Sequence, residues 1–204
     1  ELASTTGLGI GPLFASLFET GTDYIGLTIG YVYPGSPAEE AGLRRGDTIY
    51  QIGKNRITRN NYQSYMQELF YSPSGTYSIS FARYEVNEAE EKYDLNLNNT
   101  VEVKTGEYGY NPVIFAAIMT NSNIEDDGSD TTPPFNIGYM VTESFDSSAQ
   151  EVLEYQIEQF IEAGITELIL DLRFNVGGEV QQSRYLASSI VGRDYDDKHF
   201  FKAE

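Results

Sequence analysis

A strand–helix–strand pattern in the second half of the chain restricts the fold more than any other feature of the sequence. Residues 135–142 and 167–172 are short hydrophobic runs of the kind found in buried strands. Between them, residues 149–161 place apolar side chains at helical spacing, and Gly164 marks the end of that helix. A connection of this length with one helix is the crossover that a parallel strand pair requires. We therefore expect a βαβ unit, in which Ser148 and Glu151 form a capping box at the start of the helix.

The turn that follows the second of these strands carries two adjacent glycines. It reads Arg173-Phe174-Asn175-Val176-Gly177-Gly178, and helical spacing resumes near Glu179. Open α/β folds place their sites at the carboxyl ends of strands. The N–H groups of glycines at a helix N-terminus are suitable donors to an oxyanion. Gly177 and Gly178 are therefore candidate oxyanion-hole donors, although a glycine pair that only permits a tight turn fits the spacing equally well.

The first half of the chain predicts a small β-barrel with two helices. Ser36-Pro37-Ala38-Glu39 has the residues of a capping box and begins a short helix that stops at Gly42. A second helix is expected over residues 60–70, because apolar side chains recur there at helical spacing. Strands are expected at residues 24–33, 48–52, 77–84 and 92–103.

The segment from Pro34 to Asp47 resembles the most recognisable stretch of the PDZ domains of bacterial proteases. The resemblance lies in Gly35-Ser36-Pro37-Ala38, Ala41-Gly42-Leu43 and Gly46-Asp47, in that order. It implies a peptide-binding domain, whose site would lie outside this segment.

Upstream, Gly7-Leu8-Gly9-Ile10 looks like the glycine-rich loop with which PDZ domains bind a peptide's terminal carboxylate. Successive backbone N–H groups in such a loop form an anion nest, and the peptide adds as a strand beside the strand that follows. Tyr62 and Met66 on the second helix would wall this groove, or would belong to the core alone. Four residues with two glycines also fit a plain turn. Because Pro12 cannot donate to a sheet, the pairing strand must begin after it or be short.

The second half resembles the tail-specific, or C-terminal processing, peptidases (serine peptidase family S41). Residues 170–178, Leu-Asp-Leu-Arg-Phe-Asn-Val-Gly-Gly, are close to that family's signature, and residues 137–139 and 185–188 are similar to it too, especially to versions common in Bacteroidetes. The resemblance implies a two-domain α+β and α/β protein: a PDZ-like β-barrel with two helices over residues 1–104, then a partial α/β (βαβ) serine-protease core over residues 105–204. It further implies a periplasmic or cell-surface location, peptide or protein C-termini as partners, and a role for Asp171 and Arg173 in bracing the strand end.

Members of that family use a serine nucleophile with a lysine base, and this chain offers no convincing pair. After Gly178, the serines at 183, 188 and 189 belong to the expected helix, and Lys198 and Lys202 lie in a polar tail. We therefore expect a fragment of a longer serine endopeptidase that binds peptides without cleaving them, its Ser/Lys dyad lying beyond this chain. The alternative is a non-catalytic PDZ-type binding protein with a degenerate protease-like tail. Self-association through the second half is also expected, because a truncated sheet exposes an edge and apolar surface.

The composition limits the remaining function classes. A formal net charge of −18 argues against nucleic acid and anionic lipid as partners. The chain has no cysteine and a single histidine, His199, which excludes disulfides and a histidine-rich metal site. Residues 121–134 are acidic but lack the full ligand spacing of a calcium loop, so no cofactor or metal is expected. No apolar run is long enough to predict a membrane span.

Overall fold

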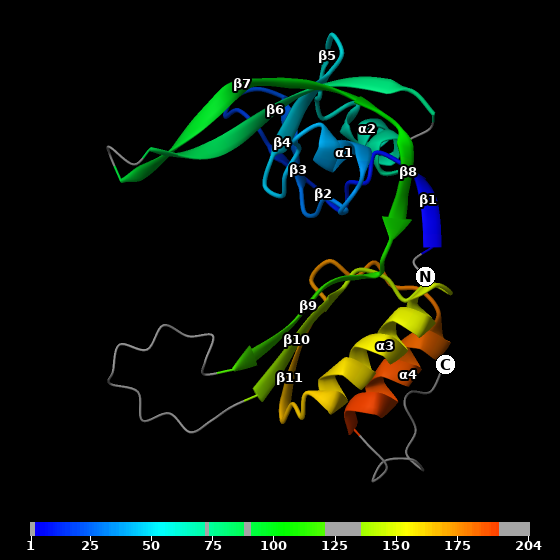
Figure 1. The fold of residues 1–204 in the computed structure, drawn as a ribbon. Coiled ribbons are helices and arrows are strands. Elements are labelled where there is room, and N and C mark those ends of the chain that lie inside the picture. Colours follow the sequence, from blue (N-terminus) through cyan, green and yellow to red (C-terminus); the bar gives the residue numbers. More distant parts are fainter. Residues whose placement is uncertain (1–2, 72–73, 88–90, 121–135, 192–204) are drawn as a thin grey trace. The chain divides into compact units, whose positions relative to one another are not determined.

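The chain forms two compact units, residues 1–110 and 111–204 (Figure 1). The computed structural model describes residues 3–71, 74–87, 91–120 and 136–191. The division falls after Tyr110, whereas the sequence indicates a boundary near residue 105. The difference arises because strand β8 (Gly106–Tyr110) pairs along its whole length with β1 (Ala3–Gly7) and so belongs to the first unit.

The first unit is built on an open antiparallel sheet. Its strands lie in the spatial order β2 (Leu13–Leu17), β3 (Ile25–Ile29), β4 (Thr48–Ile52), β6 (Thr76–Asn87) and β7 (Lys92–Lys104), and the short β5 (Asn55–Arg56) pairs with β4. Among the described residues, β2 and β7 are the two edges of this path and do not pair with each other. The prediction of a PDZ-like β region with two helices is confirmed, but the prediction of a barrel is wrong because the sheet does not close.

The first helix, α1 (Pro37–Glu40), begins as its sequence predicts. The Ser36 hydroxyl accepts a hydrogen bond from the Glu39 N–H at 3.3 Å, and the Glu39 carboxylate accepts one from the Gly35 N–H at 2.7 Å. Two N–H groups that the helix cannot satisfy internally are thereby paired. The serine half of the capping box is confirmed, whereas the glutamate accepts from Gly35 and the Ser36 N–H donates to the Tyr33 carbonyl at 3.2 Å.

The second helix, α2 (Tyr62–Tyr71), covers one face of the sheet through the fully buried Leu69. The core of the unit consists of aliphatic side chains from the strands, the loops and this helix. The most deeply buried of them are Leu8, Leu27, Ile29, Ile49, Ile57, Leu69 and Ile79.

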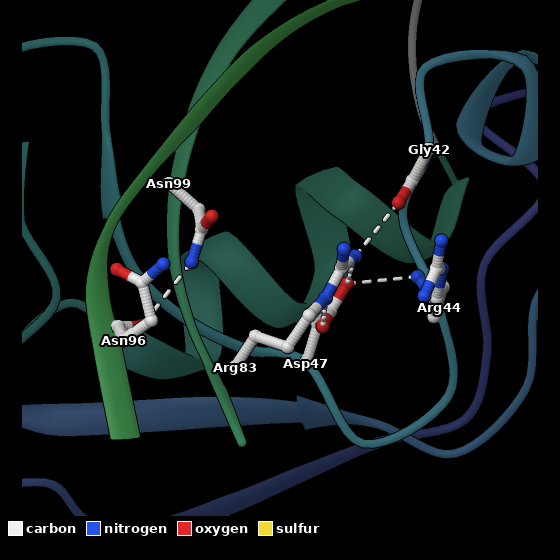
Figure 2. Close-up of polar contacts among 6 residues, drawn as sticks. All are labelled: Gly42, Arg44, Asp47, Arg83, Asn96 and Asn99. Carbon is white, nitrogen blue, oxygen red and sulfur yellow. Dashed lines mark hydrogen bonds and ion pairs between the residues drawn. The ribbon is translucent and has the colours of Figure 1, made fainter. Parts of the chain in front are cut away.

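A buried ion pair joins the loop after α1 to strand β6 (Figure 2). The Asp47 side chain is 1% exposed, and the Arg83 guanidinium donates to both of its oxygens at 2.7 Å. Arg83 also donates to the Gly42 carbonyl at 2.7 Å, and the Arg44 N–H donates to Asp47 at 2.8 Å. The hydrogen bond with Asp47 raises the pKa of Arg83 above its usual value. The Gly46-Asp47 motif therefore serves to anchor a loop and is not itself a site.

Beyond Arg83, strands β6 and β7 continue as a two-stranded ribbon. Their pairing shifts register between Phe81 and Arg83, and there the Asn99 side chain donates to the Asn96 carbonyl at 3.1 Å (Figure 2). Such a bulge bends the strands locally. The ribbon past the bulge exposes large side chains, among them Tyr84 and Tyr93.

The second unit is a three-stranded sheet with two helices. The strand order is β11 (Glu167–Asp171), β10 (Asn136–Thr142) and β9 (Val113–Thr120), and the helices are α3 (Ala149–Glu162) and α4 (Val180–Val191). Strands β10 and β11 are parallel, with Met140 opposite Leu170, and β9 is antiparallel to β10. Met140, Leu153, Phe160 and Leu186 form the centre of the core. The βαβ prediction is confirmed.

The start of α3 differs from its prediction. Ser148 has helical φ and ψ angles of −82° and −11° and makes no side-chain cap. Its N–H and its hydroxyl donate instead to one Asp146 oxygen, at 2.9 and 2.5 Å. The capping box predicted from Ser148 and Glu151 is wrong, because Asp146 supplies the acceptor two residues earlier.

Some predicted features lie outside the described residues, namely the acidic segment 121–134 and His199. Within the described part of the chain, no helix is long and apolar enough to cross a membrane. That part also contains no cluster of three or more residues suited to hold a metal ion.

Candidate functional site

The glycine turn after β11 is held against the chain segment that follows β10. A Cβ on Gly178, whose φ is +137°, would lie 2.4 Å from both the carbonyl carbon and the oxygen of Phe145. The Phe145 N–H donates to the Gly177 carbonyl at 2.7 Å, and the Glu179 N–H donates to the Phe145 carbonyl at 2.7 Å. No side chain other than hydrogen fits at Gly178, so this glycine is required by a close approach as well as by its φ angle.

Asn175 holds the same turn from inside. Its side-chain oxygen accepts the Gly177 N–H at 2.8 Å, and its amide nitrogen donates to the Thr142 carbonyl at 3.3 Å. The N–H of Gly177 is therefore engaged within the turn. Among the described residues, no acceptor binds the N–H of Gly178. Of the two candidate oxyanion donors, Gly178 is the one whose N–H is available here.

Asp171 and Arg173 form a compact pair at the end of β11. Asp171 is buried, and its carboxylate accepts the Arg173 backbone N–H at 3.0 Å and the guanidinium at 2.6–3.0 Å. The Tyr139 hydroxyl donates to the same carboxylate at 2.8 Å. These hydrogen bonds, those from Arg173 foremost, hold the pKa of Asp171 well below its usual range. The arrangement suits a brace that fixes the direction in which the chain leaves the strand.

Glu143 is a buried carboxyl group beside the turn. It is 7% exposed, and its carbonyl accepts the Val176 N–H at 2.8 Å. Burial, followed by the nearby charge of Asp146, raises the pKa of Glu143 to about 7. The group therefore changes its charge near neutral pH, in a residue whose main chain is hydrogen-bonded to the candidate oxyanion turn.

The serines that follow the turn are helical, as the sequence predicts. In α4 the Ser183 hydroxyl donates to the Val180 carbonyl at 3.0 Å, and the Ser189 hydroxyl donates to the Tyr185 carbonyl at 2.9 Å. Both hydroxyls thus donate to the main chain of their own helix, and among the described residues neither is hydrogen-bonded to a basic side chain. Lys198 and Lys202 lie outside the described residues.

The first unit offers a second candidate site along the edge strand β2. This strand begins at Leu13, immediately after Pro12, and is five residues long, as the proline required. Its outer edge is unpaired among the described residues, and α2 runs beside it. A Cβ on Gly11 would lie 3.0 Å from a ring carbon of Phe70, so the last turn of α2 meets the start of β2. An open strand edge beside a helix is the geometry of peptide binding by strand addition.

The predicted carboxylate loop lies at the start of this edge. Gly7 is the last residue of β1, opposite Gly106, while Leu8 and Ile10 bury their side chains in the core. The carbonyls of Leu8 and Gly9 accept hydrogen bonds from the Ala38 and Tyr33 N–H groups, each at 2.9 Å. Because a peptide unit is planar and trans, the N–H groups of Gly9 and Ile10 face away from these partners. The loop is thus ordered by its carbonyls, and its role in carboxylate binding remains a prediction.

Gly9 itself lies against α1. Its φ is +76°, and an added Cβ would lie 2.2 Å from the Cβ of Ser36. The two helix residues predicted to wall the groove, Tyr62 and Met66, are half-buried and pack against the core. Only the exposed parts of the Tyr62 and Met66 side chains can therefore line a groove.

Sequence reasoning did not assign site roles to Asn175, Phe145 or Glu143. Asn175 stands inside the recognised motif, so its position was a usable signal. Glu143 directly follows a hydrophobic strand and is buried, which is uncommon for a carboxylate. Phe145 carried no local signal, because only its main chain contacts the glycine turn.

Comparisons with known proteins agree with this description of the two units. Residues 28–71 match the family model of the PDZ domain, and residues 136–202 match that of peptidase family S41. A search of curated proteins gave no match. Among solved structures, a putative S41 protease from Bacteroides fragilis superposes with a TM-score of 0.60 at 22% identity, covering 90% of this chain and 44% of that one. A photosystem II D1 C-terminal processing protease superposes with a TM-score of 0.51 at 19% identity, covering 89% of this chain and 43% of that one.

The fold thus has a PDZ-like β region with short helices, followed by a mixed β/α unit. In family terms, the chain contains a PDZ domain match at residues 28–71 and a partial peptidase family S41 match at residues 136–202. It spans less than half the length of the two solved structures.

Proposed function

We propose that this chain is the substrate-recognition part of a C-terminal processing serine endopeptidase. In this proposal the PDZ domain binds the C-terminus of a peptide or protein, which adds as a strand to the free edge of β2. The observation that carries the proposal is the edge of β2 that no other described strand pairs with, with a glycine loop at its start and α2 beside it. The match to the PDZ family supports it.

The proposed hydrolysis would draw on the Gly178 N–H as a donor to the oxyanion of the tetrahedral intermediate. Its nucleophile and base would be a Ser/Lys dyad that lies outside this chain. The lysine would need a desolvated site that lowers its pKa, so that it accepts the serine proton near neutral pH. A periplasmic or cell-surface location belongs to the same proposal, and cell fractionation with an antibody to this chain tests it.

Titration with paired peptides tests the binding step. A dye-labelled peptide of about eight residues with an apolar C-terminal residue should bind with a free carboxylate and lose affinity at least tenfold when amidated, because a charge-assisted set of hydrogen bonds is lost. Fluorescence anisotropy measures both affinities. Equal binding of the two peptides would contradict carboxylate recognition.

A matched pair of glycine variants locates the site. Gly9→Ala should abolish binding, since its Cβ would collide with Ser36 and displace the loop. Gly21→Ala introduces a similar backbone strain, at φ +84°, in open space and should leave affinity unchanged. Mass spectrometry of a peptide incubated with the chain tests the hydrolysis part of the proposal. The chain by itself should leave the peptide intact.

A further inference from the structure

An arginine near the end of strand β2 is surrounded by three aromatic rings. The Arg56 Cζ lies 4.7 Å from the ring centroid of Tyr24, 4.8 Å from that of Tyr50 and 5.9 Å from that of Phe18. The rings of Phe18 and Tyr50 contact each other, with centroids 5.1 Å apart. Cation–π attraction to several rings restricts the guanidinium to a narrow range of positions.

The hydrogen-bond donors of this guanidinium are unused within the described part of the chain. There the Arg56 side chain makes no hydrogen bond and no ion pair; its carbonyl accepts one from the Asn61 side chain at 3.1 Å. Arg83 and Arg173, by contrast, each bind an aspartate. A guanidinium carries five N–H donors in a fixed fork that matches a carboxylate. Arg56 is therefore held in place and available to an anionic ligand.

The chain around Arg56 is basic, although the protein as a whole is strongly acidic. No Asp or Glu occurs between Asp47 and Glu68, whereas this interval contains Lys54, Arg56 and Arg59. This interval is a local source of positive charge in a chain with a formal net charge of −18, opposed by Glu19 and Asp23, which adjoin Phe18 and Tyr24.

The position of the cluster follows from backbone hydrogen bonds. Phe18 comes directly after β2, and its N–H donates to the Tyr24 carbonyl at 2.9 Å. Tyr24 forms a β-bridge with Thr58, whose carbonyl accepts the N–H of Tyr62, the first residue of α2. The cluster thus lies beyond the end of β2, on the face of the sheet opposite the core. Tyr24, Tyr50 and Arg56 are the strand neighbours of the core residues Ile25, Ile49 and Ile57, and successive strand residues face opposite ways.

A bound peptide would reach this end with residues upstream of its terminus. With its carboxylate at the loop before β2, the peptide must run antiparallel to that strand. A strand advances about 3.4 Å per residue, so the five residues of β2 bring the peptide residue about four to six positions before the C-terminus to the end of β2. There a peptide side chain on the sheet face opposite the core points to the same side as the cluster.

We infer that Arg56 is a specificity residue that binds the carboxylate of a glutamate or aspartate side chain at this upstream position. The inference rests on the proposed peptide groove and adds to it a preferred class of substrate, C-terminal segments with an upstream acidic residue. Tyr24, Tyr50 and Phe18 hold the guanidinium in the orientation that receives that carboxylate.

Peptides of about eight residues that differ at one position test this inference. The fifth residue from the C-terminus is Glu in one peptide, Gln in a second and Lys in a third, and each carries a dye at its N-terminus. With the wild-type chain, the Glu peptide should bind about fivefold more tightly than the Gln peptide, and the Lys peptide should bind more weakly than both. The difference should shrink as salt is added. Equal binding of the Glu and Gln peptides, measured by anisotropy, overturns the inference without any variant.

Variants then assign the effect to Arg56. Arg56→Gln should bring the Glu and Gln peptides to equal affinity, and Arg56→Lys should keep part of the preference, because it retains the charge without the fork. Lys54→Gln removes a neighbouring exposed cation and should leave the preference for the Glu peptide intact. Loss of the preference in this control assigns it to the overall positive charge of the segment and overturns the role of Arg56.

If the peptides bind with distinct free and amidated affinities but show no upstream preference, the inference fails while the peptide groove stands. If no free-acid peptide binds, the proposed function fails.

Discussion

The backbone of Gly178 and the carbonyl of Phe145 approach each other so closely that a Cβ on the glycine would lie 2.4 Å from the carbonyl carbon and oxygen. This contact joins the turn after β11 to the segment after β10, and the bond from the Phe145 N–H to the Gly177 carbonyl accompanies it. Two chain segments that leave neighbouring parallel strands are thereby held together at the candidate oxyanion donor.

Gly178→Ala should destabilise the second unit strongly, by about 3 kcal/mol or more, because it adds a backbone clash to a strained φ angle. Gly177→Ala is the matched control, since its φ is +98° but nothing lies within 4 Å of the added Cβ. The control should cost only about 1–2 kcal/mol. Urea unfolding followed by circular dichroism, with hydrogen exchange to localise the change, compares the two. Equal losses would show that the approach of Phe145 does not matter.

Asn175→Ala should open the glycine turn locally, because it removes the acceptor of the Gly177 N–H and the donor to Thr142. Loss of a hydrogen bond of this kind corresponds to about a tenfold faster amide exchange at Gly177. Asn175→Asp keeps the acceptor and should retain most of the protection. Hydrogen exchange resolved by NMR measures both, and unchanged protection in Asn175→Ala would contradict the assigned role.

The stability of the second unit should fall as pH rises from about 4.5 to about 7, owing to Glu143. Its pKa is raised from 4.5 to about 7 in the folded chain, so over this range the folded state binds more protons than the unfolded state. The full effect is about 3 kcal/mol, lost as Glu143 ionises. Glu143→Gln should remove this dependence and stabilise the unit above pH 7. Glu151→Gln, an exposed substitution on α3, should leave the pH profile unchanged; urea unfolding at a series of pH values makes the comparison.

Asp47→Asn should destabilise the first unit by about 3 kcal/mol, because it leaves Arg83 without its buried partner. Asp94→Asn breaks the exposed pair with Lys92, in which both side chains are about half exposed, and should change stability by less than about 0.5 kcal/mol. Thermal unfolding of the two variants in parallel tests the contrast. A similar small loss in both would mean that the Asp47–Arg83 pair contributes no more than a surface pair.

The local sequence determined helix caps and strand pairings that depend on a few neighbouring residues or on one repeating pattern of apolar residues. The Ser36 cap of α1 needs only Ser36 and the Glu39 N–H, which lie within one helical turn of each other, and the sequence predicts that bond correctly. The parallel pairing of β10 and β11 follows from the length and helical spacing of the segment between them. The cap of α3 shows the limit of such patterns, because Asp146 competes with Ser148 and its geometry decides which side chain accepts.

Tertiary structure alone decided the features that join residues distant in sequence. The pairing of β1 with β8 brings Gly7 opposite Gly106, and no local pattern marks either strand as the partner of the other. The sheet stays open because β2 and β7 end as edges, a matter of long-range pairing that strand propensity does not contain. The contact of Gly178 with Phe145 and the rings around Arg56 arise in the same way. Sequence therefore determined the class of the two units, while their sites depend on approaches that exist only once the chain is folded.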